Sequence, residues 1–506
     1  FSLTSDNYTL NDYIGKTGIE ASMESELQGK KGSETIYVDN LGKIIATSDY
    51  VEPRAGNDIY LTIDRDLQIA VYNLLEQKLA GILVAKIRNV KEYNPGPNTS
   101  ASSIIIPIDD VYFALFDNNV INTSRFNKDY ASVTEKEVYE TYLGKKETVL
   151  EKLNDELLTG TTPYSKLSKE YQSYESYIVN MLSSDSQAVL VRDKIDTTDD
   201  VYIAWTKDES ISLKEYLNHA ISMNWIDTSK LDLNDKYSSS EEIYNHLIEY
   251  TLKQLENNNE FSKKLYQYMI SNNDISGRQI CIILWDQDLI NVSEEKIAGL
   301  RSGNISSYDF MLECISNLQI TPAQLSLEPC SASCVITDVR TGDVKALVSY
   351  PSYDNNRLAN SADAQYLAKL NNDKSRPLWN YATQYRSAPG STFKMVSSVA
   401  AIEEDIITLN STLPCSGPFT KLTGTTHKCW INPGQHGNLN VQGAIANSCN
   451  NYFYEVGYQL SLDEEGYNAD LGVEKIAKYA DMFGLSEKSG VEISEAEPQV
   501  SDRLPV

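Results

Sequence analysis

The sequence predicts a mixed α/β (α+β) domain that is interrupted by a large helical insertion. Three observations lead to this prediction. A strand-like and then helical segment begins at Ile59, a hairpin pattern begins at Cys334, and a helix pattern follows Pro389. Residues 91–320 lie between the first two, are rich in Asn, Ser, Lys, Glu and Tyr, and show helical periodicity. We therefore expect one domain in two segments around a separate module.

The chain is acidic and long enough for several domains. It has 506 residues, 41% of them hydrophobic, and 44 basic against 71 acidic residues, a net charge of -27. This length predicts two to four domains. Such a charge would repel the phosphates of nucleic acid, which argues against a nucleic-acid partner. No run of about 20 apolar residues occurs, so we expect no segment here to span a membrane.

The N-terminal part divides into two predicted segments. Residues 1–52 are rich in glycine and turn residues, contain two short strand-like pieces, and are too few to form a core of their own. In residues 53–90, Ile59, Leu61 and Ile63 alternate as in a strand, and the pattern becomes helical near Asp64. We assign residues 53–90 to the first segment of the α/β domain.

The insertion and the second segment have different patterns. Within residues 91–320, apolar residues recur every three and four positions over several stretches, which predicts a mostly helical insertion. Residues 321–506 form the second segment. Two apolar runs there flank Gly342, which can adopt the positive φ of a tight hairpin. A helix is predicted after Pro389 and Gly390.

Ser391 and Lys394 are candidates for chemistry because they lie one helical turn apart on one face. A lysine amine that burial keeps neutral can remove the proton of a serine nucleophile. Ser-x-x-Lys is common, and an exposed pair on an ordinary helix is the alternative. Ser448 and Asn450 could complete the site as a proton relay and as an orienting group for Lys394.

Several stretches together resemble the class B penicillin-binding proteins, membrane-anchored D,D-transpeptidases that cross-link peptidoglycan, of the elongation or sporulation type. The resemblance implies a penicillin-binding/serine β-lactamase-like transpeptidase domain, with residues 1–52 as the end of an N-terminal pedestal of the dimerisation type. The stretches are GKTGIEASMESELQG, LTIDRDLQ, TGDVKALVSYPSYDNN, APGSTFK, HGNLNVQGAIANSCNNYFYEVG and FGLSEKSGVEIS.

The resemblance implies that Ser391 attacks the penultimate D-Ala carbonyl of a peptidoglycan stem peptide. Lys394 would be the general base, and Ser448 and Asn450 the relay and positioning groups. β-Lactams would acylate the same serine. A serine β-lactamase or D,D-carboxypeptidase could use these motifs too, and a non-catalytic cell-wall scaffold or sensor could keep the fold. The pedestal and the insertion favour the transpeptidase, although the insertion's own role, docking or mere embellishment, stays open.

The sequence departs from the family in its third motif. No Lys-Thr-Gly follows Asn450, and Lys16-Thr17-Gly18 lies in the pedestal pattern instead. We expect the chain to be truncated before the catalytic Lys-Thr-Gly strand and nearly inactive as written, because losing one oxyanion donor costs about 3 kcal/mol. The resemblance also implies an extracytoplasmic domain, a single-pass membrane anchor missing from this fragment, and a membrane glycosyltransferase partner contacted through the pedestal.

Cys415, Cys429, His436 and Cys449 are candidate ligands for a structural Zn²⁺, because three thiolates and an imidazole suit a closed tetrahedral site. The resemblance implies a zinc beside the active site, with Cys449 inside the Ser-x-Asn motif as one ligand. Two alternatives remain: a disulfide between Cys415 and Cys429, or unconnected thiols. His427 is a possible substitute for His436.

Overall fold

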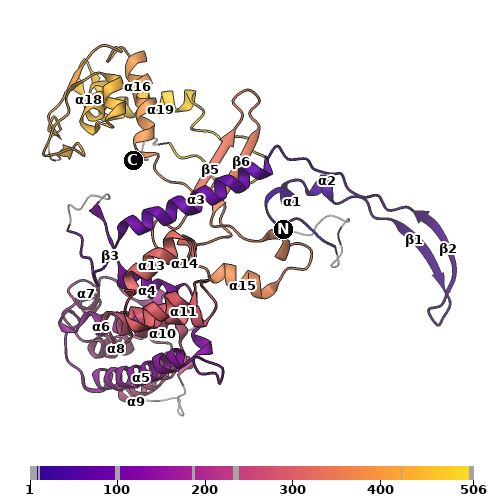
Figure 1. Cartoon of the computed structure of the whole chain (residues 1–506), viewed down its shortest axis with the longest axis vertical. Helices are drawn as coiled ribbons and strands as arrows, with labels where there is room; N and C mark the ends of the chain where they lie inside the picture. Colours follow the sequence, from indigo (N-terminus) through magenta and orange to yellow (C-terminus); the bar gives the residue numbers. More distant parts are fainter. Residues whose placement is uncertain are drawn as a thin grey trace. The chain divides into compact units, whose positions relative to one another are not determined.

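The computed structural model describes residues 8, 12–96, 103–184, 188–231, 239–422, 424 and 426–500. The chain divides into two compact units, whose elements are drawn in Figure 1. Among the residues that the structure describes, no helix is both long and apolar enough to cross a membrane. Unit 1 comprises Phe1–Asp64, Val335–Leu347 and Trp379–Val506, and unit 2 comprises Arg65–Cys334 and Val348–Leu378.

Unit 1 begins with two short helices and a two-stranded antiparallel hairpin, as the strand-like pieces of the sequence predict. Nearly every side chain of both strands is exposed, so the hairpin has no core of its own. Thr17 and Gly18, of the Lys-Thr-Gly in this region, lie at the start of the first helix and not in a strand. The four elements are α1 (Gly18–Ser22), α2 (Glu24–Leu27), β1 (Ser33–Val38) and β2 (Ile44–Val51).

The predicted strand at Ile59 is wrong, because residues 55–64 belong to no strand or helix in the structure. The Asp64 backbone N–H donates to the carbonyl of Lys345 (2.9 Å), and the Thr62 hydroxyl donates to that of Val344 (2.7 Å). One of these contacts comes from a side chain, so the segment meets its neighbour without the repeating main-chain ladder that defines a strand. The alternation of apolar residues therefore did not correspond to a paired strand.

The hairpin predicted around Gly342 is confirmed. β5 (Ala332–Thr337) pairs with β6 (Val344–Tyr350), and Gly342 has a φ of +80° in the connecting turn. A residue with a Cβ would be strained in this left-handed conformation, which is why glycine suits the turn.

The C-terminal part of unit 1 packs three helices around a small apolar core. α16 (Lys394–Glu403), α18 (Asn450–Leu460) and α19 (Ala469–Met482) lie side by side (Figure 1) and bury Ala400 and Val456 among others. This part of unit 1 also contains several short elements. These are η7 (Gly390–Phe393), β7 (Leu413–Cys415), β8 (Pro418–Phe419), β9 (His427–Lys428), β10 (Gly437–Leu439), α17 (Val441–Ala446), β11 (Leu462–Asp463) and β12 (Gly466–Tyr467).

Unit 2 is mostly helical, as predicted for the insertion. Its first helix, α3 (Arg65–Lys86), packs against α13 and α14 and therefore groups with the insertion, whereas we assigned its residues to the α/β domain. The further elements are β3 (Ile87–Arg88), β4 (Ile106–Pro107), α4 (Ile108–Asp117), η2 (Thr123–Arg125), α5 (Val133–Thr159), η3 (Tyr164–Lys166), α6 (Lys169–Leu182), η4 (Arg192–Lys194), α7 (Asp200–Thr206), α8 (Leu213–Ser222), η5 (Thr228–Lys230), α9 (Ser240–Glu256), α10 (Asn259–Ser271), α11 (Gly277–Asp286), α12 (Glu294–Ser302), α13 (Ser307–Ser316), α14 (Pro322–Leu325), η6 (Asn355–Arg357) and α15 (Ala364–Asn372).

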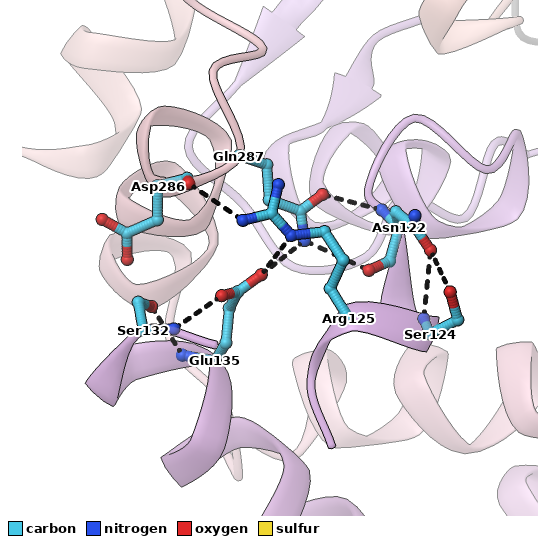
Figure 2. A network of polar contacts seen from close by, with 7 residues as sticks. All are labelled: Asn122, Ser124, Arg125, Ser132, Glu135, Asp286 and Gln287. Carbon is cyan, nitrogen blue, oxygen red and sulfur yellow. Dashed lines mark hydrogen bonds and ion pairs between the residues drawn. The ribbon is translucent and has the colours of Figure 1, made fainter. Parts of the chain in front are cut away.

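A buried polar network joins the start of α5 to the end of α11 (Figure 2). The fully buried Glu135 accepts hydrogen bonds from the Ser132 backbone N–H (2.8 Å) and from Gln287 Nε2 (2.8 Å). Arg125 Nε lies 3.6 Å from the same carboxylate and supplies the positive charge that a buried anion needs. Gln287 also accepts from the Asn122 backbone N–H (2.9 Å), so the network fixes the loop before α5.

Candidate active site

Ser391 lies on a turn that places its side chain at the surface. It is exposed and belongs to the 3₁₀ turn η7, which leads into α16 at Lys394. Gly390, with a φ of +59°, begins this turn. A 3₁₀ turn has three residues per turn, so Lys394 lies directly one turn beyond Ser391. We expected an α-helix at Ser391, but the helix begins only at Lys394.

Ser448 lies on a strained turn between α17 and α18. Its φ is +46°, a left-handed conformation that glycine usually adopts at this position after a helix. Two backbone bonds hold it there, from Ser448 N–H to the Ile445 carbonyl and from Cys449 N–H to the Ala444 carbonyl, both 2.9 Å. A residue with a Cβ costs about 1 kcal/mol in this conformation. The backbone of this turn would therefore be more stable with glycine at position 448 than with serine, which carries the hydroxyl.

The structure brings Ser391, Lys394, Ser448 and Asn450 together. Ser448 Oγ lies 2.9 Å from Ser391 Oγ. Lys394 Nζ donates to the Ser448 carbonyl (2.9 Å), to Ser448 Oγ (3.1 Å) and to Asn450 Oδ1 (2.7 Å). Ser448 therefore lies between the hydroxyl of Ser391 and the amine of Lys394.

The surroundings of Lys394 affect its charge in opposite directions. Partial burial lowers the pKa of Lys394, and electrostatic interaction with the thiols of Cys429 and Cys449 opposes this change. Its Nζ also lies 5.5 Å from the centre of the Phe453 ring, which favours a cation. Because burial is the largest cause, the amine is easier to deprotonate than a free lysine, as a general base requires.

Cys415, Cys429, His436 and Cys449 form one compact cluster beside these residues. Their ligand atoms all lie within 4.8 Å of one another. His436 Nδ1 is 3.5 Å from Cys415 Sγ and 3.6 Å from Cys429 Sγ, and the sulfurs of Cys429 and Cys449 are 3.9 Å apart. The cysteine sulfurs are buried, and Cys449 also caps α18 by accepting from the Tyr452 backbone N–H (3.4 Å).

The dimensions of this cluster fit a tetrahedral zinc. Zn–S bonds of about 2.3 Å and Zn–N bonds of about 2.0 Å place sulfurs about 3.8 Å apart and sulfur and nitrogen about 3.5 Å apart. The separations in the structure are close to these values. All seven cysteines lie within the described residues and all are free, so the Cys415–Cys429 disulfide is not present. His427 is exposed and does not belong to the cluster.

The thiols of the cluster differ in acidity. Burial raises the pKa of Cys429, but backbone N–H groups of Asn451, Ile431 and Asn450 outweigh burial and lower it overall. Burial raises the pKa of Cys449 to about 12, and the neighbouring thiols Cys429 and Cys415 add to this. Crowded thiols resist ionisation together unless a cation lies among them. The donor set is therefore suited to a metal cation.

One residue at the site was not predicted from the sequence. Trp430 directly follows Cys429, and its indole Nε1–H donates to the carbonyl of Asn447 (3.0 Å), the residue before Ser448. Its ring contacts His436 at a centroid distance of 5.5 Å. The sequence offered one signal for this residue, which is that a tryptophan directly follows a candidate metal ligand in a polar loop.

Two family models match this chain. Residues 332–503 match the penicillin binding protein transpeptidase domain, and residues 2–61 match the penicillin-binding protein dimerisation domain. Residues 62–331, which include the insertion, lie between the two matches. These two domains, together with the relatives described next, support a class B penicillin-binding protein.

Known relatives match the chain over a limited part. It is 35% identical to the peptidoglycan D,D-transpeptidase MrdA of Escherichia coli strain K12 over 166 residues, which is 32% of this chain and 24% of that protein. It is 35% identical to PbpA of Mycolicibacterium smegmatis over 164 residues, 31% of each chain. The penicillin-binding protein PBP2 structure from Helicobacter pylori is 29% identical over 34% of this chain and 30% of that chain, with a TM-score of 0.30. The chain thus spans less than a third of its curated relatives.

Proposed function

We propose that this chain carries the nucleophilic centre of a peptidoglycan-cross-linking D,D-transpeptidase that acts on D-Ala-D-Ala stem peptides. The observation that carries the proposal is the position of Ser448 Oγ, within hydrogen-bond distance of both Ser391 Oγ and Lys394 Nζ. A serine, a lysine that burial makes easier to deprotonate, and a hydroxyl between them are the groups that serine acyl transfer requires. The names of the D,D-transpeptidase relatives MrdA and PbpA support the substrate class.

The hydrogen bonds of Lys394 indicate how the proton leaves Ser391. An ammonium group has three N–H donors, and three acceptors surround Nζ. When Lys394 is neutral, one contact must reverse and donate to the amine. The Ser448 carbonyl and Asn450 Oδ1 can only accept, so Ser448 Oγ must be the donor. Ser448 can then take the proton of Ser391 and pass its own to Lys394.

The acyl transfer has two steps. Ser391 Oγ bonds to the carbonyl carbon of the penultimate D-Ala, its proton moves through Ser448 to Lys394, and the peptide C–N bond breaks. The terminal D-Ala leaves as an amine, which takes up the proton from Lys394 through Ser448. An amine from a second stem peptide then attacks the ester in the reverse sense. In a β-lactam the amine nitrogen that is released when the C–N bond breaks remains attached to the acyl group through the opened ring, so no group departs and the acyl-enzyme persists.

The test is the intact mass of the full-length protein after incubation with penicillin, with the adduct mapped to a residue. We expect the mass of one penicillin on Ser391 and none in Ser391→Ala. Ser397→Ala, which changes a serine on the same helix, is the matched control and should be acylated like wild type. The absence of any adduct from folded protein would overturn the proposal and favour a scaffold that has kept the fold.

We also propose that Cys415, Cys429, His436 and Cys449 hold a structural Zn²⁺. The free cysteines and the tetrahedral spacing of the four ligand atoms support this. Four protein ligands leave no open position, so the ion would supply stability and not a reactive water. Cys449 lies between Ser448 and Asn450, and holding it would fix both neighbours.

We further propose that the chain acts outside the cytoplasm and meets a membrane glycosyltransferase through its N-terminal part. The match of residues 2–61 to the dimerisation domain and the exposed apolar side chains of the β1–β2 hairpin, such as Ile45, support a contact surface there. Co-purification of the full-length protein from membranes with and without Ile45→Asp tests the proposal. Equal recovery of the partner with both proteins would contradict it.

A further inference from the structure

Trp430 is a largely exposed tryptophan with an unusual hydrogen bond. Its side chain is 64% exposed, yet its indole N–H donates to the carbonyl of Asn447 at 3.0 Å. The edge of the ring meets the imidazole of His436, with the ring planes at 63°. Trp430 therefore connects the cluster loop to the residue that precedes Ser448.

The carbonyl of Asn447 lies in the peptide plane that directly precedes Ser448. The φ angle of Ser448 is the rotation about its N–Cα bond, and that nitrogen belongs to the peptide plane that contains the Asn447 carbonyl. A hydrogen bond that fixes this carbonyl therefore fixes the plane from which φ is measured. The Asn447 side chain adds a second tie, because its Nδ2 donates to the Gly443 carbonyl (2.9 Å).

The conformation of Ser448 needs such ties because it is strained. A non-glycine residue keeps a φ of +46° only where its surroundings hold it. Lys394 holds the carbonyl on the far side of Ser448 (2.9 Å), and Trp430 holds the carbonyl on the near side. If the near side is released, only the bond from Ser448 N–H to the Ile445 carbonyl (2.9 Å) still holds this peptide plane, and the looser plane lets Ser448 Oγ move away from Ser391.

We propose that Trp430 is a positioning residue that acts through its indole N–H, which holds the turn at Ser448 so that Ser448 Oγ stays between Ser391 and Lys394. The proposal rests on the proposed acyl transfer and adds a residue to the same site. Trp430 acts on the rate of acylation and not on the binding of the acyl donor, because the hydrogen bond faces the backbone of the protein.

Two variants distinguish the effect of the indole N–H of Trp430 from the effect of its ring. Trp430→Phe keeps an aromatic ring but loses the donor, whereas Trp430→Ala loses both. Penicillin acylation of the full-length protein is followed over a range of concentrations, which separates the limiting acylation rate from the dissociation constant of the non-covalent complex. Trp379→Phe is the matched control, because Trp379 is a half-exposed tryptophan of the same unit (46%). Zinc content is measured on each protein.

We expect both Trp430 variants to acylate about three- to tenfold more slowly, which corresponds to the loss of one ordinary hydrogen bond, with an unchanged dissociation constant and zinc content. Trp379→Phe should acylate like wild type. A wild-type rate in Trp430→Phe with a weakened complex only in Trp430→Ala would overturn the proposal, because the ring would then act on the acyl donor directly. If wild type itself is not acylated, the proposed function fails and not the role of Trp430 alone.

A second measurement applies even if a variant fails to fold. The indole N–H groups of the full-length wild-type protein are observed by NMR with ¹⁵N-labelled tryptophan, and their exchange with water is compared. Exposure alone predicts faster exchange for Trp430 than for Trp379. The hydrogen bond to Asn447 predicts slower exchange for Trp430, and faster exchange there would overturn the proposal.

Discussion

The hydroxyl of Ser448 lies 2.9 Å from that of Ser391, at the end of a turn that is strained by a φ of +46°. The second contact of this hydroxyl is the amine of Lys394 at 3.1 Å. Because the turn adopts a conformation that suits glycine, the position of this hydroxyl costs backbone stability. The chain therefore retains strain at the residue that connects the proposed nucleophile, Ser391, to its proposed base, Lys394.

The strain predicts opposite effects on stability and activity at Ser448. The free energy of unfolding of Ser448→Gly should be about 1 kcal/mol higher than that of Ser448→Ala, because only glycine adopts this left-handed conformation without strain. Both variants lack the hydroxyl and should acylate slowly. Urea denaturation of the full-length proteins measures the difference. Equal stabilities of the two variants would show that the turn is not strained.

Asn450→Asp should shift the pH dependence of acylation to higher pH. Asn450 Oδ1 lies 2.7 Å from Lys394 Nζ, so a carboxylate there stabilises the ammonium form. Burial lowers the pKa of Lys394, and the new charge counteracts this by raising it. Less neutral amine is then present at a given pH, and the rate rises only at higher pH. Asn438→Asp, on the exposed part of β10, is the control, and an unchanged profile in Asn450→Asp would contradict the role of Lys394 as base.

His436→Ala should lose zinc whereas His427→Ala should keep it. Only His436 lies within the cluster, and His427 is an exposed histidine in the same loop region. Zinc content by mass spectrometry and the midpoint of thermal unfolding measure both variants. We expect His436→Ala and chelator-treated wild type to unfold at lower temperature, because metal binding stabilises only the folded state. Retention of zinc by His436→Ala would exclude this ligand set.

The insertion should lose stability as the pH rises, because of Glu175. This residue of α6 is 3% exposed, its Oε2 has no hydrogen-bond partner among the described residues, and burial raises its pKa to about 8. Its pKa in the unfolded chain is near 4.5. Between pH 4.5 and about 8 the carboxyl of Glu175 therefore keeps its proton in the folded state but has lost it in the unfolded chain. The stability that Glu175 contributes is therefore fully present below pH 4.5 and is lost as the pH rises to about 8. Glu175→Gln should flatten this part of the profile of urea denaturation against pH, and the exposed Glu140→Gln should not.

Much of the site could be predicted from the sequence because its motifs are local. Ser391 and Lys394 are three residues apart, and Ser448 and Asn450 are two apart, so each pair is positioned by one turn of backbone. Their meeting across the core could be expected only from the resemblance to a family. The strain at Ser448 could not, because it depends on which backbone bonds close the turn after α17.

The fold was predictable to a similar degree. The hairpin around Gly342 has a local turn residue that requires positive φ, and helical periodicity indicated the insertion. Strand pairing at Ile59 depends on a partner far along the chain, so alternation alone gave the wrong element. The grouping of α3 with the insertion depends on packing against α13 and α14, which no local pattern shows.

The most direct test of the relay is the rate of penicillin acylation at Ser391 in Ser448→Ala, compared with wild type and Ser397→Ala in the full-length protein. Positioned proton transfer contributes at least about a hundredfold to such steps. We predict that Ser448→Ala is acylated about a hundredfold more slowly, still at Ser391, while Ser397→Ala reacts like wild type. A wild-type rate in Ser448→Ala would show that Lys394 takes the proton without Ser448 and would contradict the account.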